Sequence, residues 1–263
     1  MKKLVMLSSV LVLLVVMVAC GEDASTATND GDTNDGGSGN GVLTMGTSAD
    51  YEPFQFIDLE NNNEIIGFDV DLARHIAAEL GYELEIVDMN FNSLITALRS
   101  GRVDMVLAGM TPTSERLEVV DFSDIYHFGR NVLLTFDDAL INSLEDLNGI
   151  ILGAQSGSIQ ADAAVELQES GIDVELREMD RMPDLVQQLL SRRIDAIVIE
   201  EMVTAVYLEN NENFVLIDIL EQNDKGSAVA LPQGSELTEQ INEIIAKMQE
   251  NGELEALAIK WFQ

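Results

Sequence analysis

Apolar residues along this chain follow two alternating patterns. In some stretches they recur every three or four residues, and in others four or five of them follow one another, as in amphipathic helices and buried strands. Leu94 to Arg116 contains both patterns, with a helical stretch, a turn at Gly101 and the apolar run Val103–Leu107. Because such units alternate along the chain, the pattern predicts an α/β fold with parallel strands.

This helix-turn-strand pattern occurs again ninety-one positions later. A duplicated unit predicts two similar lobes. In α/β sheets ligands bind at the carboxyl ends of strands, so the two strand ends, Gly109 and Glu200, are expected to face each other across a cleft. The aligned pairs are Ser100 with Ser191, Arg102 with Arg193, Asp104 with Asp195, and Val106 with Ile197.

Turn and cap residues predict the order of the remaining elements. Gly81 should end a helix that begins near Phe68, and Asn92 should cap the next helix. Ser143–Asp146 has the sequence of a capping box, and Pro183 suits a first helical turn. The expected strands are Val42–Thr47, Leu84–Val87, Val103–Leu107, Val132–Phe136, Ile150–Ala154, Asp173–Glu178, Asp195–Glu200, Val215–Ile219 and Ser227–Leu231.

The segments 132–136 and 227–231 are expected to cross between the lobes. Residues 42–131 would then form the first part of lobe 1, residues 132–222 lobe 2, and residues 223–263 the return to lobe 1. Two crossing strands form a hinge about which lobes can close on a ligand.

The first forty-one residues are not expected to belong to the folded body. Residues 1–19 combine two lysines with a short apolar stretch, as an export signal does, and the run is too short to span a bilayer. Cys20 is the single cysteine and ends a segment that resembles a bacterial lipobox, which implies a lipid anchor. Residues 20–41 are polar and small, which favours a flexible tether over a calcium loop.

The formal net charge of −33 excludes nucleic acid as a natural partner. Because the acidic residues are spread along the whole chain, solubility in a saline or alkaline medium explains them better than a cationic ligand does. The two histidines, His75 and His127, have no metal-ligand spacing, and neither a catalytic triad nor a phosphate loop is found. We therefore expect no metal and no cofactor.

Seven motifs in register resemble the extracellular solute-binding proteins of ABC importers, in the polar amino-acid-binding family (family 3). The resemblance extends over residues 42–263 and implies a type II periplasmic-binding-protein fold with two α/β lobes joined by a two-strand hinge. The motifs are GTSADYEPF, IGFDVDLA, SLITALRSGRVDM, GMTPTSER, VVDFSD, SLEDLNG and KWF.

This resemblance implies a site for a free L-amino acid in a monomeric, lipid-anchored protein on the extracellular face of the bacterial cell membrane, which delivers its ligand to a membrane permease. An amino acid needs a cation for its carboxylate, an acid for its ammonium and a wall for its side chain. The residues implied are Ser48, Tyr51, Phe91, Ala108, Gly109, Thr111, Arg116, Ser158, Ile159 and Glu200.

Arg116 would bind the ligand carboxylate with both arms of its guanidinium, with Thr111 adding a hydroxyl and Gly109 offering backbone to the ammonium. The backbone at Ser158 and Ile159, at a helix N-terminus, can donate N–H groups to the same carboxylate. Glu200 would oppose the ammonium, and Tyr51 and Phe91 would enclose the ligand side chain.

The ligand class stays open among arginine, lysine and glutamine. Ser48 stands where binders of basic amino acids often carry an acid, so a polar ligand suits it at least as well as a cationic one, while cation–π stacking keeps arginine in the set. An enzyme resembling cyclohexadienyl dehydratase is the alternative, with Glu200 as general acid. A receptor's sensing module is disfavoured, because no membrane helix follows before Gln263.

Overall fold

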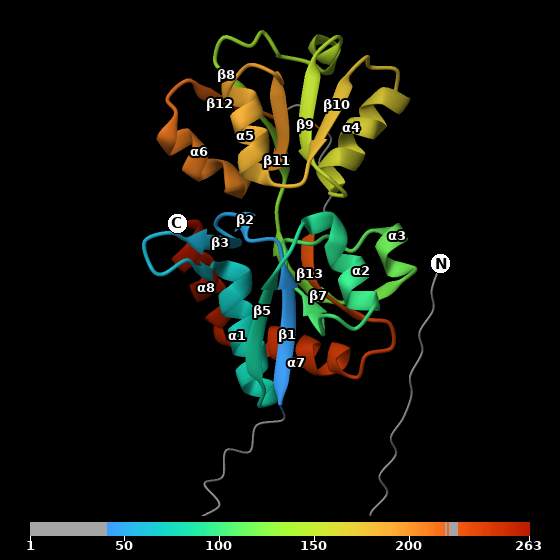
Figure 1. Cartoon of the computed structure of the whole chain (residues 1–263), viewed down its shortest axis with the longest axis vertical. Helices are drawn as coiled ribbons and strands as arrows, with labels where there is room; N and C mark the ends of the chain where they lie inside the picture. The colour runs from blue at the N-terminus through green and yellow to red at the C-terminus, as the bar shows by residue number, and fades with distance from the viewer. Residues whose placement is uncertain (1–40, 219, 221–225) are drawn as a thin grey trace, which may run out of the picture. The chain divides into compact units, whose positions relative to one another are not determined.

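The computed structural model describes residues 41–218, 220 and 226–263, and the predicted signal peptide, Cys20 and nearly all of the predicted tether lie outside them. Two five-stranded sheets with helices packed against them form lobes 1 and 2, as predicted (Figure 1). Lobe 1 has the strand order β5 (Glu83–Asp88), β1 (Val42–Thr47), β6 (Met105–Val106), β13 (Gly226–Pro232), β7 (Val120–Phe128). Lobe 2 has the order β10 (Glu175–Met179), β9 (Ile151–Gln155), β11 (Ala196–Glu200), β8 (Asn131–Phe136), β12 (Phe214–Ile217).

The strands predicted to pair in parallel do so in lobe 1, but the sheets of both lobes are mixed, since in lobe 2 β8 pairs antiparallel with β11 and β12. β1 pairs in parallel with β5 and β6, but β13 pairs antiparallel with both β6 and β7. Parallel neighbours need a crossover connection, usually a helix. The helices α1 (Phe68–Leu80) and α2 (Leu94–Arg99) provide these connections in lobe 1. β7 and β13 lead out of lobe 1 and back into it, so they run in opposite directions.

Each strand that was expected to cross between the lobes lies in one sheet only. β8 belongs to lobe 2 and β13 to lobe 1. The chain passes from lobe 1 to lobe 2 at residues 129–130, next to the predicted boundary at 131/132, and returns between β12 and β13, where the boundary at 222/223 lies outside the described residues.

Local signals in the sequence place most helix ends correctly. Gly81 ends α1 in the left-handed conformation, Ser143 and Asp146 form the predicted capping box, and Pro183 lies in the first turn of α5. The cap predicted at Asn92 was wrong: Asn92 lies inside the 3₁₀ helix η1 (Phe91–Ser93), and Ser93 precedes α2. The helices are α1 (Phe68–Leu80), α2 (Leu94–Arg99), α3 (Ser114–Leu117), α4 (Ile159–Glu169), α5 (Met182–Leu190), α6 (Ala205–Asn210), α7 (Leu237–Asn251) and α8 (Glu253–Phe262).

The two copies of the repeat make equivalent contacts. In lobe 1 the carboxylate of Asp104 accepts from the Thr44 N–H at 2.8 Å, while the Asp104 N–H donates to the Thr44 carbonyl at 2.8 Å. In lobe 2 Asp195 makes the same pair of bonds with Ile151, at 2.7 and 2.9 Å. Each aspartate therefore fastens neighbouring parallel strands, β6 to β1 in lobe 1 and β11 to β9 in lobe 2, which explains why it occurs in both copies.

A small antiparallel sheet of β2 (Asp50–Tyr51), β3 (Gln55–Asp58) and β4 (Glu64–Ile66) lies beside α1 in lobe 1 and contains the predicted hairpin. The C-terminal helices α7 and α8 pack on lobe 1, against β7 and α1, as expected. Within the described residues, no helix has the length and apolar character that crossing a membrane requires.

Candidate functional site

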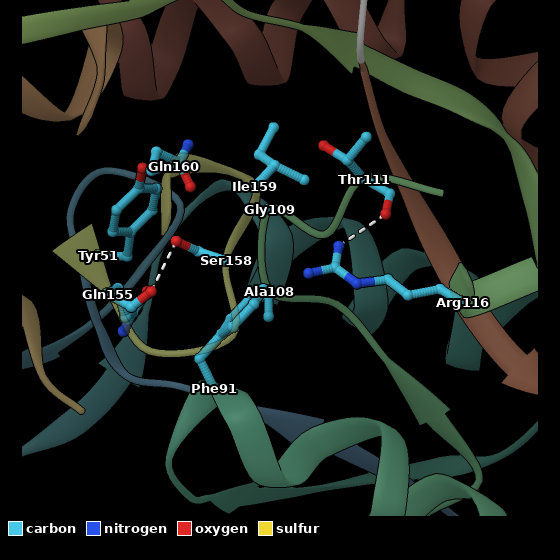
Figure 2. A pocket seen from close by; sticks show the side chains of 10 residues that line it. All are labelled: Tyr51, Phe91, Ala108, Gly109, Thr111, Arg116, Gln155, Ser158, Ile159 and Gln160. Carbon is cyan, nitrogen blue, oxygen red and sulfur yellow. Dashed lines mark hydrogen bonds between the residues drawn. The ribbon is translucent and has the colours of Figure 1, made fainter. Parts of the chain in front are cut away.

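A pocket with about 280 Å³ of empty space lies between the strand ends of the two lobes. All the predicted site residues except Ser48 and Glu200 line it, and they surround one space in Figure 2. The lining residues are Tyr51, Phe91, Ala108, Gly109, Thr111, Arg116, Gln155, Ser158, Ile159 and Gln160.

Arg116 brings to this pocket a positive charge that has no ion-pair partner among the described residues. Its Nη1 donates to the Thr111 carbonyl at 2.7 Å and its Nη2 to the Gly157 carbonyl of lobe 2 at 2.9 Å. None of the ion pairs between described residues includes Arg116. Two neutral carbonyl oxygens occupy N–H donors without balancing the charge, so the site is suited to an anion.

Burial lowers the pKa of Arg116 below its ordinary value, and the acidic Asp162 and Glu115 only partly oppose this effect. An arginine stays protonated in a protein, so the shift measures the cost of desolvating its charge. Its guanidinium also lies 5.4 Å from the centre of the Phe91 ring. A ligand carboxylate would offset this cost.

Lobe 2 presents the N-terminus of α4 to the same pocket. Ser158 caps α4, because its hydroxyl accepts from the Ala161 N–H at 3.2 Å, and it also donates to the Gln155 carbonyl at 2.7 Å. The start of a helix carries unpaired N–H groups and a partial positive charge. Together with Arg116 it makes this end of the pocket favourable for a carboxylate.

The sequence did not reveal Gln155 and Gln160, which also line the pocket. The amide nitrogen of Gln155 donates to the Asp180 carbonyl at 3.2 Å and to the Asp50 carboxylate at 3.4 Å, and that of Gln160 donates to Asn131 at 2.9 Å. The two N–H donors of the Gln155 amide are both engaged, which leaves its carbonyl oxygen, an acceptor, for a ligand. The bond to Asn131 engages one donor of Gln160, so its second N–H remains beside its carbonyl oxygen. The signal for Gln155 was its place at the end of a buried strand.

Ser48 and Glu200 are buried beside the pocket without lining it. The Ser48 hydroxyl donates to Asp50 at 2.9 Å. The Glu200 carboxylate lies 3.1 Å from Nε2 of His127, in space that exists because residue 129 is glycine: a Cβ there would lie 2.1 Å from Oε1 of Glu200. A buried carboxylate needs a polar partner, and His127 supplies one. The predicted contact between Glu200 and an ammonium stays a prediction.

Two hydrogen bonds fix the backbone of Glu200 and of Gly109 at the site. The Glu200 N–H donates to the Tyr51 hydroxyl at 3.3 Å, which links lobe 2 to an aromatic wall of lobe 1. The buried Asp69 carboxylate accepts from the Gly109 N–H at 2.7 Å, and burial raises the pKa of Asp69 to about 7. Asp69 was present in the IGFDVDLA motif, but its contact with Gly109 required the fold.

At the rim of the cleft, a network of side chains that we call the latch joins the lobes outside the pocket. Arg181 of lobe 2 binds the Asp88 carboxylate of lobe 1 with both arms, at 2.9 and 3.0 Å, and its Nε donates to Asn90 at 3.1 Å. Asp180 accepts from the amides of Asn90 and Asn92 at 2.9 and 3.2 Å. These bonds form only when the lobes are together.

No group of His, Cys, Asp and Glu side chains arranged for a metal ion occurs in the described part of the chain. His127 contacts Glu200, and His75 lies 3.7 Å from Glu253. The described polar groups at the pocket comprise N–H donors at the Arg116 end, the hydroxyls of Tyr51 and Thr111, and the amides of Gln155 and Gln160. This arrangement fits a small zwitterion.

Comparison with known proteins agrees with this geometry. Residues 43–263 match the sequence model of the bacterial extracellular solute-binding proteins, family 3. The arginine-binding extracellular protein ArtP of Bacillus subtilis is 46% identical over 95% of this chain and 97% of its own length.

Solved structures give the same result. The substrate-binding protein of an amino acid ABC transporter is 41% identical, with a TM-score of 0.79 over 84% of this chain and 99% of its own. The amino acid ABC transporter substrate-binding protein AbpA of Streptococcus pneumoniae, bound to L-arginine, is 34% identical, with a TM-score of 0.78 over 84% of this chain and 94% of its own.

Proposed function

This chain belongs to family 3 of the bacterial extracellular solute-binding proteins, and from that premise we propose that it captures L-arginine outside the cell and delivers it to an ABC importer. The observation that carries the proposal is the guanidinium of Arg116, which enters the pocket with two carbonyl partners and no described carboxylate. The α-carboxylate of an amino acid would supply the missing charge in bidentate geometry.

The pocket groups that would contact the ligand side chain favour arginine over lysine and glutamine. The Gln155 amide presents its carbonyl oxygen, an acceptor, because both of its N–H donors are engaged, and a guanidinium has donors only. The aromatic walls Tyr51 and Phe91 suit its flat, weakly hydrated cation. The relatives that are named for arginine, or bound to it, support the same choice.

For the ligand ammonium we propose the backbone of Gly109 and the carboxylate of Glu200. Glu200 adjoins the pocket through its bond with the Tyr51 hydroxyl. To bind an ammonium, the Glu200 carboxylate would have to leave His127. It would then replace one charge-assisted hydrogen bond by another.

We propose binding without turnover. Among similar structures is the ancestral amino-acid-binding protein AncCDT-1, described as a precursor of cyclohexadienyl dehydratase, with 34% identity and a TM-score of 0.77. In this chain the Glu200 carboxylate is bound to His127 and does not line the pocket. Turnover of prephenate or arogenate by the purified protein would contradict the proposal.

The lipid anchor on Cys20, the tether and the monomeric state remain part of the proposal and rest on the sequence alone. Acyl chains bring membrane affinity by burying CH₂ groups, and a polar tether would let the lobes meet a permease. A Cys20→Ser variant expressed in a bacterial host is expected to leave the membrane fraction.

A thermal-shift screen of the twenty amino acids tests the ligand. L-arginine should raise the melting temperature most, since a ligand at a hundredfold excess over its Kd stabilises the folded state by about 2.7 kcal/mol. L-lysine and L-glutamine should give smaller shifts. No shift with any amino acid would overturn the proposed function, and a larger shift with glutamine would reassign its ligand.

Because the latch lies outside the pocket, breaking it should lower the affinity for every ligand to a similar extent. Arg181→Ala should weaken binding of each ligand by about fivefold, because the partly exposed bonds of Arg181 to Asp88 and Asn90 contribute roughly 1 kcal/mol to closure. The loss should shrink at high salt, which screens the wild-type pair.

Calorimetric titration at low and high salt measures the loss. Arg177→Ala is the matched control, because Arg177 pairs with Glu175 of its own strand, at 2.7 Å. An Arg181 variant with wild-type affinity, or one that changes the preference among ligands, would contradict the prediction.

A further inference from the structure

Asp50 does not line the pocket, yet it contacts a residue that does. We propose that Asp50 determines the preference for a cationic ligand side chain, because its carboxylate holds the amide of Gln155 so that the pocket meets the carbonyl oxygen of that amide. This inference rests on the proposed function and adds the selecting device to it.

The contacts of Asp50 place it at the junction of three segments. Its Oδ1 accepts from the Ser48 hydroxyl at 2.9 Å, and its Oδ2 accepts from the Met182 N–H at 2.9 Å and from Gln155 Nε2 at 3.4 Å. A carboxylate only accepts hydrogen bonds. It therefore attracts the nitrogen end of the Gln155 amide and repels the oxygen end.

A second acceptor enforces the same orientation. The amide nitrogen of Gln155 also donates to the Asp180 carbonyl at 3.2 Å. With both N–H donors directed at Asp50 and Asp180, an amide flip would set its oxygen against a carbonyl and a carboxylate. The amide of a buried glutamine is thereby fixed, and its Oε1 is the atom that remains for the ligand.

Orientation of this amide decides which ligands match the pocket. The Gln155 carbonyl oxygen can accept from the N–H groups of a guanidinium. A neutral isostere, which has an oxygen in place of one NH₂ group, would place that oxygen against the Gln155 oxygen. Sites that hydrogen-bond a substrate group discriminate strongly, because a mismatch leaves buried polar groups unpaired.

The contact between Asp50 and Gln155 can form only when the lobes are closed. Asp50 lies on β2 of lobe 1, whereas Gln155 and Met182 belong to lobe 2. The Asp50 carboxylate also bonds the first N–H of α5, where a helix favours negative charge. The lobes must meet before Asp50 can fix the amide, so selection and closure are coupled.

A double-mutant cycle with two ligands tests this. L-arginine and L-citrulline differ by one NH₂ group and one charge, and calorimetry gives the ratio of their Kd values. Asp50→Asn should reduce the preference for arginine about tenfold, because an asparagine side chain can donate as well as accept and no longer fixes the Gln155 amide. In a Gln155→Leu background, the same substitution should leave the ratio unchanged.

The cycle separates the two ways in which Asp50 could act. An equal fall in both backgrounds would mean that its charge attracts the ligand directly through space, and would overturn the inference, as would an unchanged ratio in Asp50→Asn. Asp50→Glu keeps the carboxylate and should keep much of the preference, which covers the case in which the asparagine variant does not fold.

Asp58→Asn on the neighbouring strand β3 is the control for loss of an acidic side chain and should not change the ratio. If the wild-type protein bound neither ligand, the proposed function itself would fail. Binding of both ligands with an unchanged ratio in Asp50→Asn would overturn the role of Asp50 alone.

Discussion

Arg116→Ala is expected to weaken L-arginine binding by between about thirtyfold and several thousandfold, because removing one partner of a desolvated, hydrogen-bonded charge pair costs about 2–5 kcal/mol. The ligand carboxylate would then lie in the pocket with only the N-terminus of α4 to offset its charge. The variant also loses the bond to the Gly157 carbonyl, one of the contacts between the lobes.

Titration calorimetry with three variants separates these contributions. Arg116→Lys keeps the charge without the fork and should bind with intermediate affinity. Arg102→Ala removes an exposed arginine of the same lobe and should bind as the wild type does. An Arg116→Ala protein that retains affinity within about threefold would show that the carboxylate binds elsewhere, and the assignment of the pocket's anionic end would be wrong.

Features that depend on one segment at a time could be predicted from the sequence. The repeat containing Asp104 and Asp195 gave the two lobes. Of the two predicted strand ends, Gly109 lines the pocket, whereas Glu200 lies beside it. Arg116 was predicted from its motif, and the fold explains its position: Thr113 caps α3 by accepting from the Arg116 N–H at 3.3 Å.

Features that depend on how distant segments meet could not be predicted. Nothing in the sequence near Glu200 indicates that glycine at 129 leaves room for its carboxylate beside His127. The same holds for Asp50 and Gln155, which are 105 positions apart in the chain and meet across the cleft. The mixed sheet of lobe 1 also follows from the return of the chain through β13, which no local period encodes.

Gly67→Ala is expected to cause the largest loss of stability, about 3 kcal/mol or more, which lowers the melting temperature of a domain of this size by roughly 6–12 °C. Gly67 precedes α1 with a φ of 134°, a conformation that L-residues rarely adopt. A Cβ at this position would also lie 2.2 Å from the carbonyl oxygen of Phe54, so strain and collision add.

Phe54 cannot move aside without a cost to the pocket. Its carbonyl accepts from the Asp69 N–H at 2.9 Å, and the Asp69 carboxylate in turn holds the Gly109 N–H at 2.7 Å. We therefore expect Gly67→Ala to lower the affinity for L-arginine as well as the stability. Gly101→Ala is the matched control: φ is 71° there, but no atom lies within 4 Å of the added Cβ, so the cost should be only about 1 kcal/mol.

Thermal unfolding of the two glycine variants, with and without L-arginine, measures both effects. The melting temperature should fall by roughly 2–4 °C in Gly101→Ala and by several times more in Gly67→Ala, and only the latter should show a smaller shift on adding ligand. Equal losses would mean that the positive φ alone sets the cost and that the contact with Phe54 is not a constraint. If L-arginine raised the melting temperature of a destabilised Gly67→Ala protein as much as that of the wild type, Asp69 would have no role in ligand binding.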